Sequence, residues 1–89
     1  MIEVAFSSSF LKAYKKRISK NPELVSLFKA KLSIFIQNPY SPELRTHKLS
    51  GKLEMLMSFS VKYDLRILFY FAEPDKAVFT DIGNHDEVY

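Results

Sequence analysis

The chain has 89 residues, of which 47% are hydrophobic and 15% aromatic, so it suits one small domain (residues 1–89) and is too apolar for a disordered protein. The absence of cysteine excludes a disulfide framework and thiolate chemistry, and it favours a reducing, cytoplasmic location. No apolar run approaches the ~20 residues of a membrane span, and the first residues carry no signal-peptide pattern. We therefore expect no membrane partner.

The net charge of +3 is unevenly distributed along the chain. Residues 1–52 carry ten basic and three acidic side chains, whereas residues 53–89 carry three basic and seven acidic ones. A basic half of this kind is typical of proteins that bind a polyanion such as nucleic acid. A solvated lysine face that only keeps the protein soluble gives the same pattern, and composition alone leaves both interpretations open.

The first 38 residues predict one strand followed by two helices. Alternating apolar residues predict a strand over residues 2–6, and the serines at 7–9 offer a helix N-cap. Apolar side chains then recur at helical spacing from Phe10 to Ile18, with basic residues between them. A second helix begins at Asn21-Pro22 and ends by Asn38-Pro39. The short connection predicts an antiparallel helical hairpin.

The remaining residues predict a loop and three strands. Residues 38–52 contain two prolines and a polar run, which indicates a loop. A half-buried strand over residues 55–62 precedes a central strand over residues 63–72, whose long apolar run predicts burial on both faces. The last strand covers residues 77–82. The sequence thus predicts an α+β domain in which the N-terminal strand and a three-stranded antiparallel meander form one sheet, with the helical hairpin on one face.

Arg66 lies within the predicted central strand, where a charge is costly unless a partner or a ligand meets it. Its position near the start of the strand predicts that the guanidinium emerges at the rim of the sheet beside Asp64. The last strand is antiparallel to the central one, so Gly83 is expected beside Asp64, and His85 and Tyr89 are within reach. His47 reaches this region only if its long loop folds back along the sheet.

A histidine, a carboxylate, an arginine and a tyrosine suit RNA cleavage. The reaction needs a base for the 2′-hydroxyl proton, an acid for the leaving 5′-oxygen and a cation for the phosphorane. An aromatic ring can also stack on a base. Simpler interpretations remain open at this point: a surface histidine, Asp64 as a turn residue, Arg66 as the ion-pair partner of Asp64 or Asp81, and Tyr89 as a packing residue.

Metal and nucleotide-cofactor chemistry find no support in the sequence. The two histidines are far apart and match no metal-ligand spacing, and Gly51 and Gly83 cannot form a glycine-rich phosphate loop. We expect neither a cofactor nor a metal.

Three segments together resemble the RelE/ParE superfamily of type II toxins, in particular its YafQ/RelE-like messenger-RNA interferase branch. They are His47–Gly51 (HKLSG), Tyr63–Ile67 (YDLRI) and Asp81–Tyr89 (DIGNHDEVY). The resemblance implies a RelE-like microbial RNase fold and a ribosome-dependent endoribonuclease of the plasmid-stabilisation type. It also implies cleavage of messenger RNA in the ribosomal A site and a cognate antitoxin as protein partner.

Carried over position by position, the resemblance gives a catalytic set. It implies that His85 is the general acid and that Asp64 or His47 is the general base. Arg66 would stabilise the scissile phosphate, and Tyr89 would stack on a nucleobase or orient the phosphate. The basic residues expected to contact RNA are Lys12, Lys15, Lys16, Arg17, Lys48 and Lys52. The chain lacks a further histidine that YafQ-like toxins carry in the strand before the aspartate, where it has Ser58–Val61, and Met57 stands where relatives often have tryptophan.

Two other functions remain open. A ParE-like toxin inhibits DNA gyrase by binding alone, and the two histidines argue for cleavage because such a binder would not need them. A degenerate toxin that serves only as an antitoxin-binding module would retain the fold and binding surface without cleaving RNA.

Overall fold

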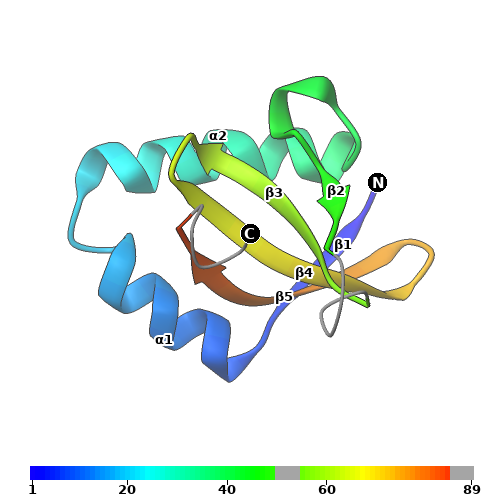
Figure 1. Ribbon diagram of the computed structural model, residues 1–89, viewed down its shortest axis with the longest axis horizontal. Coiled ribbons are helices and arrows are strands. Elements are labelled where there is room, and N and C mark those ends of the chain that lie inside the picture. Colours follow the sequence, from blue (N-terminus) through cyan, green and yellow to red (C-terminus); the bar gives the residue numbers. More distant parts are fainter. Residues whose placement is uncertain (50–54, 85–89) are drawn as a thin grey trace.

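A computed structural model of the protein describes residues 1–49 and 55–84, which form two α-helices and a five-stranded sheet (Figure 1). The elements are β1 (Glu3–Phe6), α1 (Ser8–Arg17), α2 (Pro22–Gln37), the short 3₁₀-helix η1 (Pro42–Leu44), β2 (His47–Lys48), β3 (Met57–Lys62), β4 (Leu65–Glu73) and β5 (Lys76–Gly83). Neither α-helix in this part of the chain is long and apolar enough to cross a membrane.

The strands are arranged in the order β1-β5-β4-β3-β2. β3, β4 and β5 form the predicted antiparallel meander, and β1 joins the open edge of β5 in a parallel pair. The α+β class and the order of the main elements predicted from the sequence are therefore confirmed. Figure 1 shows the two helices joined at one end and diverging from it, with α1 running beside β5 and α2 passing behind the sheet.

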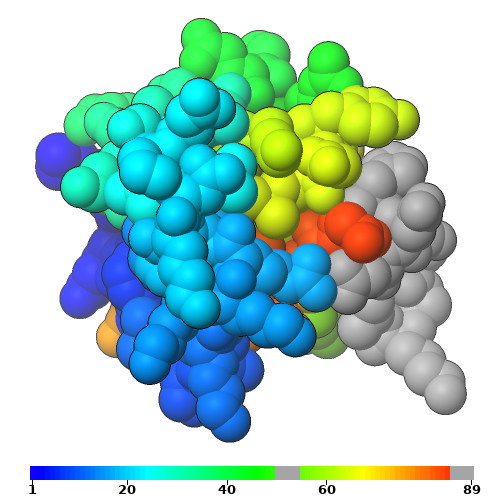
Figure 2. Space-filling model, turned by 90° about the vertical axis from the view of Figure 1, so that its left-hand side faces the viewer, coloured from blue at the N-terminus to red at the C-terminus, as the bar shows by residue number. Residues whose placement is uncertain are grey.

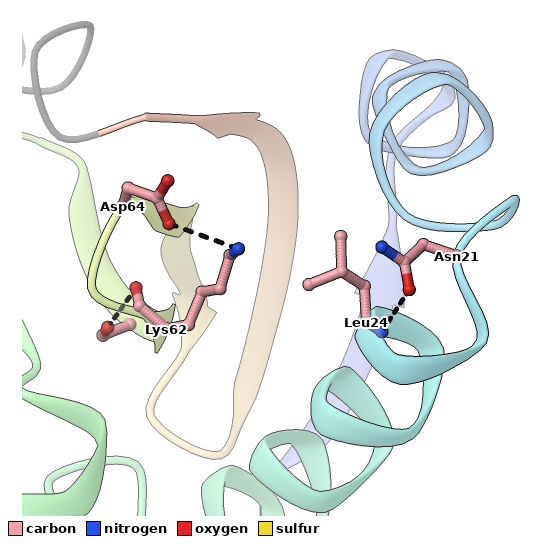
Figure 3. A network of polar contacts seen from close by, with 5 residues as sticks. Asn21, Leu24, Lys62 and Asp64 are labelled. Atoms are coloured by element: carbon pink, nitrogen blue, oxygen red, sulfur yellow. Dashed lines mark hydrogen bonds and ion pairs between the residues drawn. The ribbon is translucent and has the colours of Figure 1, made fainter.

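Both helices begin at the residues that the sequence indicates. The Oγ of Ser7 accepts a hydrogen bond from the backbone N–H of Phe10 at 3.1 Å, which caps α1. The Oδ1 of Asn21 accepts from the N–H of Glu23 at 3.0 Å and from the N–H of Leu24 at 3.3 Å, which caps α2. Figure 3 shows the second of these bonds. These caps satisfy N–H groups that have no partner within the helix.

The core lies between the helices and one face of the sheet, and Phe35 of α2 stands at its centre. Its ring is fully buried, and its centroid lies 5.0 Å from that of Phe59, 4.9 Å from that of Phe69 and 5.2 Å from that of Phe79. The last two contacts are nearly perpendicular, a favoured geometry for aromatic pairs. One helix residue thus contacts all three strands of the meander.

The segment predicted to be a loop from residue 38 to 52 contains the helix η1 and the edge strand β2, so that prediction is wrong for its middle part. β2 pairs with β3, and the N–H of Leu49 donates to the carbonyl of Leu56 at 3.0 Å. Leu44 and Leu49 are buried and anchor the segment in the domain. A two-residue strand of polar composition has no alternation that a sequence pattern could detect.

The prediction that the strand before the central one is half-buried is also wrong. β3 is buried on both faces from Met57 to Val61, and Ser58 and Ser60 are 0% and 7% exposed. Their small side chains stand on the face away from the helices, where Ser58 lies between His47 and Leu68 and Ser60 lies beside Arg66. For the central strand, burial on both faces is found at its beginning, from Leu65 to Ile67, and is lost toward Glu73.

We predict that replacing Phe35 by alanine lowers the free energy of unfolding by about 3–5 kcal/mol, because the cavity would face three aromatic rings. Replacement by leucine should cost less, since it retains most of the buried volume. Urea unfolding measures both values. Leu11→Ala, at a position 53% exposed, is the control and should cost at most about 1 kcal/mol. A Phe35→Ala loss no larger than that of the control would contradict the central position of this ring.

Candidate functional site

The face of the sheet away from the helices carries the candidate site. Residues paired across neighbouring strands direct their side chains to the same face. One row across the sheet therefore consists of His47, Ser58, Leu68 and Asp81, and the next row of Ser60, Arg66 and Gly83. His47 and Arg66 share this face two strands apart, with a Cα separation of about 12 Å from standard strand spacing.

Arg66 is buried within this face rather than at its rim. Only 6% of the residue is exposed, so the expectation that its guanidinium emerges beside Asp64 is wrong. Its place is in the second row, between Ser60 and Gly83. The pKa of Arg66 is lowered, first by burial and then by the positive charge of Arg45, while Tyr63 acts in the opposite direction. The positive charge of Arg45 therefore acts on Arg66 at this site.

Asp64 lies in the tight turn between β3 and β4 and is largely exposed. Its carboxylate forms an ion pair with the Nζ of Lys62 at 3.6 Å, and the two side chains are 64% and 47% exposed (Figure 3). Such a solvated pair adds little to stability. Asp64 thus stands at the edge of the site, beside a cation that the sequence interpretation had not paired with it.

His47 is the first residue of β2, so the segment before β3 does fold back along the sheet. The Nδ1 atom of the ring lies 2.9 Å from the carbonyl oxygen of Arg45. Because a carbonyl oxygen only accepts hydrogen bonds, Nδ1 carries the proton in this contact. The neutral ring is then the Nδ1–H tautomer, in which Nε2 is the basic nitrogen.

Sequence reasoning missed two residues that lie at this site, Arg45 and Tyr63. Arg45 follows η1 and adopts a left-handed conformation with φ 51° and ψ 44°. Tyr63 is 76% exposed in the turn beside Asp64 and influences the pKa of Arg66. The position of Arg45 two residues before His47 was the only available signal, and nothing in the sequence indicates its backbone conformation.

The basic residues of α1 gather beside the end of β5. Lys12, Lys16 and Arg17 line a hollow of about 390 Å³ together with Ser9, Ala13, Asp81 and Ile82. The hollow exists because α1 continues from β1 alongside β5, where the Oγ of Ser9 donates to the carbonyl of Thr80 at 2.6 Å. Figure 2 shows α1 (blue), the end of β5 (orange-red) and the β3–β4 turn (yellow-green) on one side of the molecule.

The other residues proposed from the sequence are placed differently. Lys15 is exposed and does not line the hollow. Lys48 pairs with Met57, whose side chain is in the core, so Lys48 belongs to the face opposite that of His47. Lys52, His85 and Tyr89 lie outside the described residues. Gly83, which the meander topology predicted beside Asp64, pairs with Arg66 two residues further along.

Within residues 1–49 and 55–84, histidine, aspartate and glutamate side chains do not come together in threes as a metal site would require. The described part of the site contains the carboxylates of Asp64, at its edge and paired with Lys62, and of Asp81, in the row of His47. Its other polar side chains are cationic or aromatic: two arginines, one histidine and one tyrosine. Such a set can bind and stabilise a negatively charged group.

No protein-family model and no curated protein sequence matches the chain. Several solved structures do. The match to YafQ from Escherichia coli strain BL21(DE3) spans 100% of this chain and 99% of the YafQ chain, with a TM-score of 0.78 and 16% sequence identity. The match to a chain of the YoeB–YefM complex from Staphylococcus aureus spans 96% of this chain and 98% of that chain, with a TM-score of 0.75 and 16% sequence identity. A metal-bound toxin from Helicobacter pylori covers 100% of both chains, with a TM-score of 0.73 and 22% identity. The chain therefore has the fold of YafQ- and YoeB-type toxins.

We predict that His47 of the folded protein is the Nδ1–H tautomer in its neutral form, because Arg45 offers a carbonyl acceptor 2.9 Å from Nδ1. Long-range ¹H–¹⁵N spectra above pH 8 distinguish the two ring nitrogens. The control is the same protein in concentrated urea, where this contact is absent and the Nε2–H tautomer should regain population. A folded protein with mainly Nε2–H at His47 would contradict the contact.

Proposed function

We propose that the chain is the toxin of a type II toxin–antitoxin pair and acts as an endoribonuclease on messenger RNA in the ribosomal A site. The observation that carries the proposal is the joint placement of His47 and the buried Arg66 on one sheet face. The same fold occurs in YafQ and in the YoeB of the YoeB–YefM complexes, which supports the assignment.

The proposed reaction is transesterification by the 2′-hydroxyl of the RNA. A base removes the 2′-hydroxyl proton, the 2′-oxygen attacks phosphorus, and the bond to the 5′-oxygen breaks as an acid protonates that oxygen. Arg66 stabilises the negative charge that develops on the non-bridging oxygens. Burial strengthens this effect because it excludes the water that would screen the guanidinium.

His47 is the better base of the two candidates among the described residues. An imidazole is a stronger base than a carboxylate, and the bond from Nδ1 to the Arg45 carbonyl leaves Nε2 as its basic nitrogen. The carboxylate of Asp64 is exposed and paired with Lys62, which suits a role in placing the turn. His85 is proposed as the general acid and Tyr89 as a stacking residue, on the strength of the resemblance described above.

The hollow beside α1 is proposed to bind RNA phosphates through Lys12, Lys16 and Arg17. Lys15, Lys48 and Lys52 are proposed to make peripheral phosphate contacts. A cognate antitoxin is proposed as the protein partner, because YoeB is found in complexes with YefM. The proposed place of action is the cytoplasm, where ribosomes and messenger RNA are found.

We predict that His47→Ala and His85→Ala each abolish growth arrest on induced expression and the new message ends seen by primer extension. Arg66→Lys should lower the cleavage rate about 10²- to 10³-fold, since it retains the charge but not the planar fork. Lys29→Ala, on the exposed surface of α2, is the control and should behave as wild type. Circular dichroism verifies that each variant is folded.

Other outcomes would replace the proposal. Growth arrest with intact messages and a DNA-damage response would indicate a gyrase inhibitor. Absence of arrest with wild-type protein, together with binding to an antitoxin, would indicate a degenerate binding module. Cleavage at the wild-type rate by His85→Ala would contradict the assignment of that residue.

We also predict that the double variant Lys12→Gln/Lys16→Gln binds single-stranded RNA with a weaker salt dependence than wild type. Removal of one phosphate interaction should reduce the slope of log affinity against log salt by about 0.7. Fluorescence anisotropy at several salt concentrations measures the slope. Lys20→Gln/Lys29→Gln removes the same charge from exposed positions outside the hollow. Equal slopes for the two double variants would show that the hollow has no specific part in RNA binding.

A further inference from the structure

Arg45 has an unusual backbone conformation for its residue type. In the described ranges 1–49 and 55–84 it is the one non-glycine residue with a positive φ. Glycine adopts this region freely, and asparagine does so more readily than arginine. An observed outlier of this kind is a reason to look for a functional role of the side chain.

The conformation of Arg45 places two of its groups at the candidate site. Its backbone carbonyl holds the ring of His47, as described above. Its side chain lies close enough to Arg66 for the positive charge of one to lower the pKa of the other. The strand register agrees. β2 is antiparallel to β3 and His47 pairs with Ser58, so the residues before His47 lie toward Ser60, which pairs with Arg66.

Two neighbouring guanidinium groups repel each other, and burial of Arg66 makes the repulsion stronger. A bound anion reverses the sign of this interaction, since both cations then attract it. Arginine also presents a planar fork of N–H donors that matches the oxygens of a phosphate. The pair is therefore well suited to a phosphate-bearing ligand.

We propose that Arg45 and Arg66 together form a binding site for a phosphodiester group, with Arg45 as a second phosphate-binding residue that the resemblance to toxins did not supply. The choice of RNA as the ligand rests on the proposed function. Arg66 contacts the phosphate from within the sheet face, and Arg45 contacts it from the exposed side. The left-handed backbone of Arg45 ties this phosphate site to His47, because the same residue holds the histidine ring.

The test uses the full-length protein and two probes, inorganic phosphate and a short single-stranded RNA whose 2′-hydroxyl groups are methylated so that it cannot be cleaved. The decisive variant is Arg45→Gly. It removes the guanidinium but keeps the carbonyl that holds His47, and glycine suits the left-handed conformation. Lys29→Ala is the matched control because it also removes one exposed positive charge.

We expect Arg45→Gly to bind the methylated RNA about 10- to 100-fold more weakly than wild type, in line with the loss of charge-assisted hydrogen bonds. The RNA affinity of Arg45→Lys should lie between those of Arg45→Gly and wild type, and the affinity of Lys29→Ala should match that of wild type. The urea midpoint of Arg45→Gly should equal or exceed that of wild type, and His47 should keep its tautomer. Phosphate titration should shift the Nε–H resonances of Arg45 and Arg66 in the wild-type protein.

Each outcome bears on one of the two proposals. RNA affinity of Arg45→Gly equal to that of wild type, with cleavage intact, would overturn the two-arginine site and leave the endoribonuclease assignment standing. Arg45-dependent binding of phosphate and RNA by a wild-type protein that neither cleaves messages nor arrests growth would support the site and overturn the proposed function. Binding of neither probe by wild-type protein would overturn the two-arginine site, and growth arrest with message cleavage would still decide the proposed function.

Discussion

The two-residue alternation of β4 is the constraint on which both the core and the candidate site depend. Because successive side chains of a strand point to opposite faces, Ile67 and Phe69 enter the aromatic core while Arg66 is directed to the other face. A shift of one residue in the pairing would place the arginine among phenylalanines. The contacts of Phe35 with the meander strands therefore also determine where the guanidinium stands.

The costs that the fold tolerates are concentrated on one face of the sheet. A buried arginine, a second positive charge that acts on it and a left-handed non-glycine residue each carry a cost in stability. The aromatic core and the two capped helices are regular by comparison. Unfavourable features gathered at one place are typical of functional sites.

Much of the fold was predictable from local patterns. Helix caps, helical spacing and the strand alternation gave the order of the main elements and the α+β class, and the meander topology placed Gly83 beside the start of β4. The edge strand β2 was not predictable, because two polar residues carry no periodic signal. Of the candidate site, Arg66, His47 and Asp64 were named from the sequence, while Arg45 and Tyr63 were not.

The sequence by itself determined which side chains β4 directs to each face, since the alternation is a property of the chain. Only the tertiary structure decided that Arg66 is buried and that Asp64 pairs with Lys62. It also decided that His47 comes to the face of Arg66 and that the charge of Arg45 acts on Arg66. These features depend on hydrogen bonds and packing between segments distant in the sequence, notably the pairing of β2 with β3. Such contacts follow from the balance of the whole fold, and short-range patterns of residues carry little information about them.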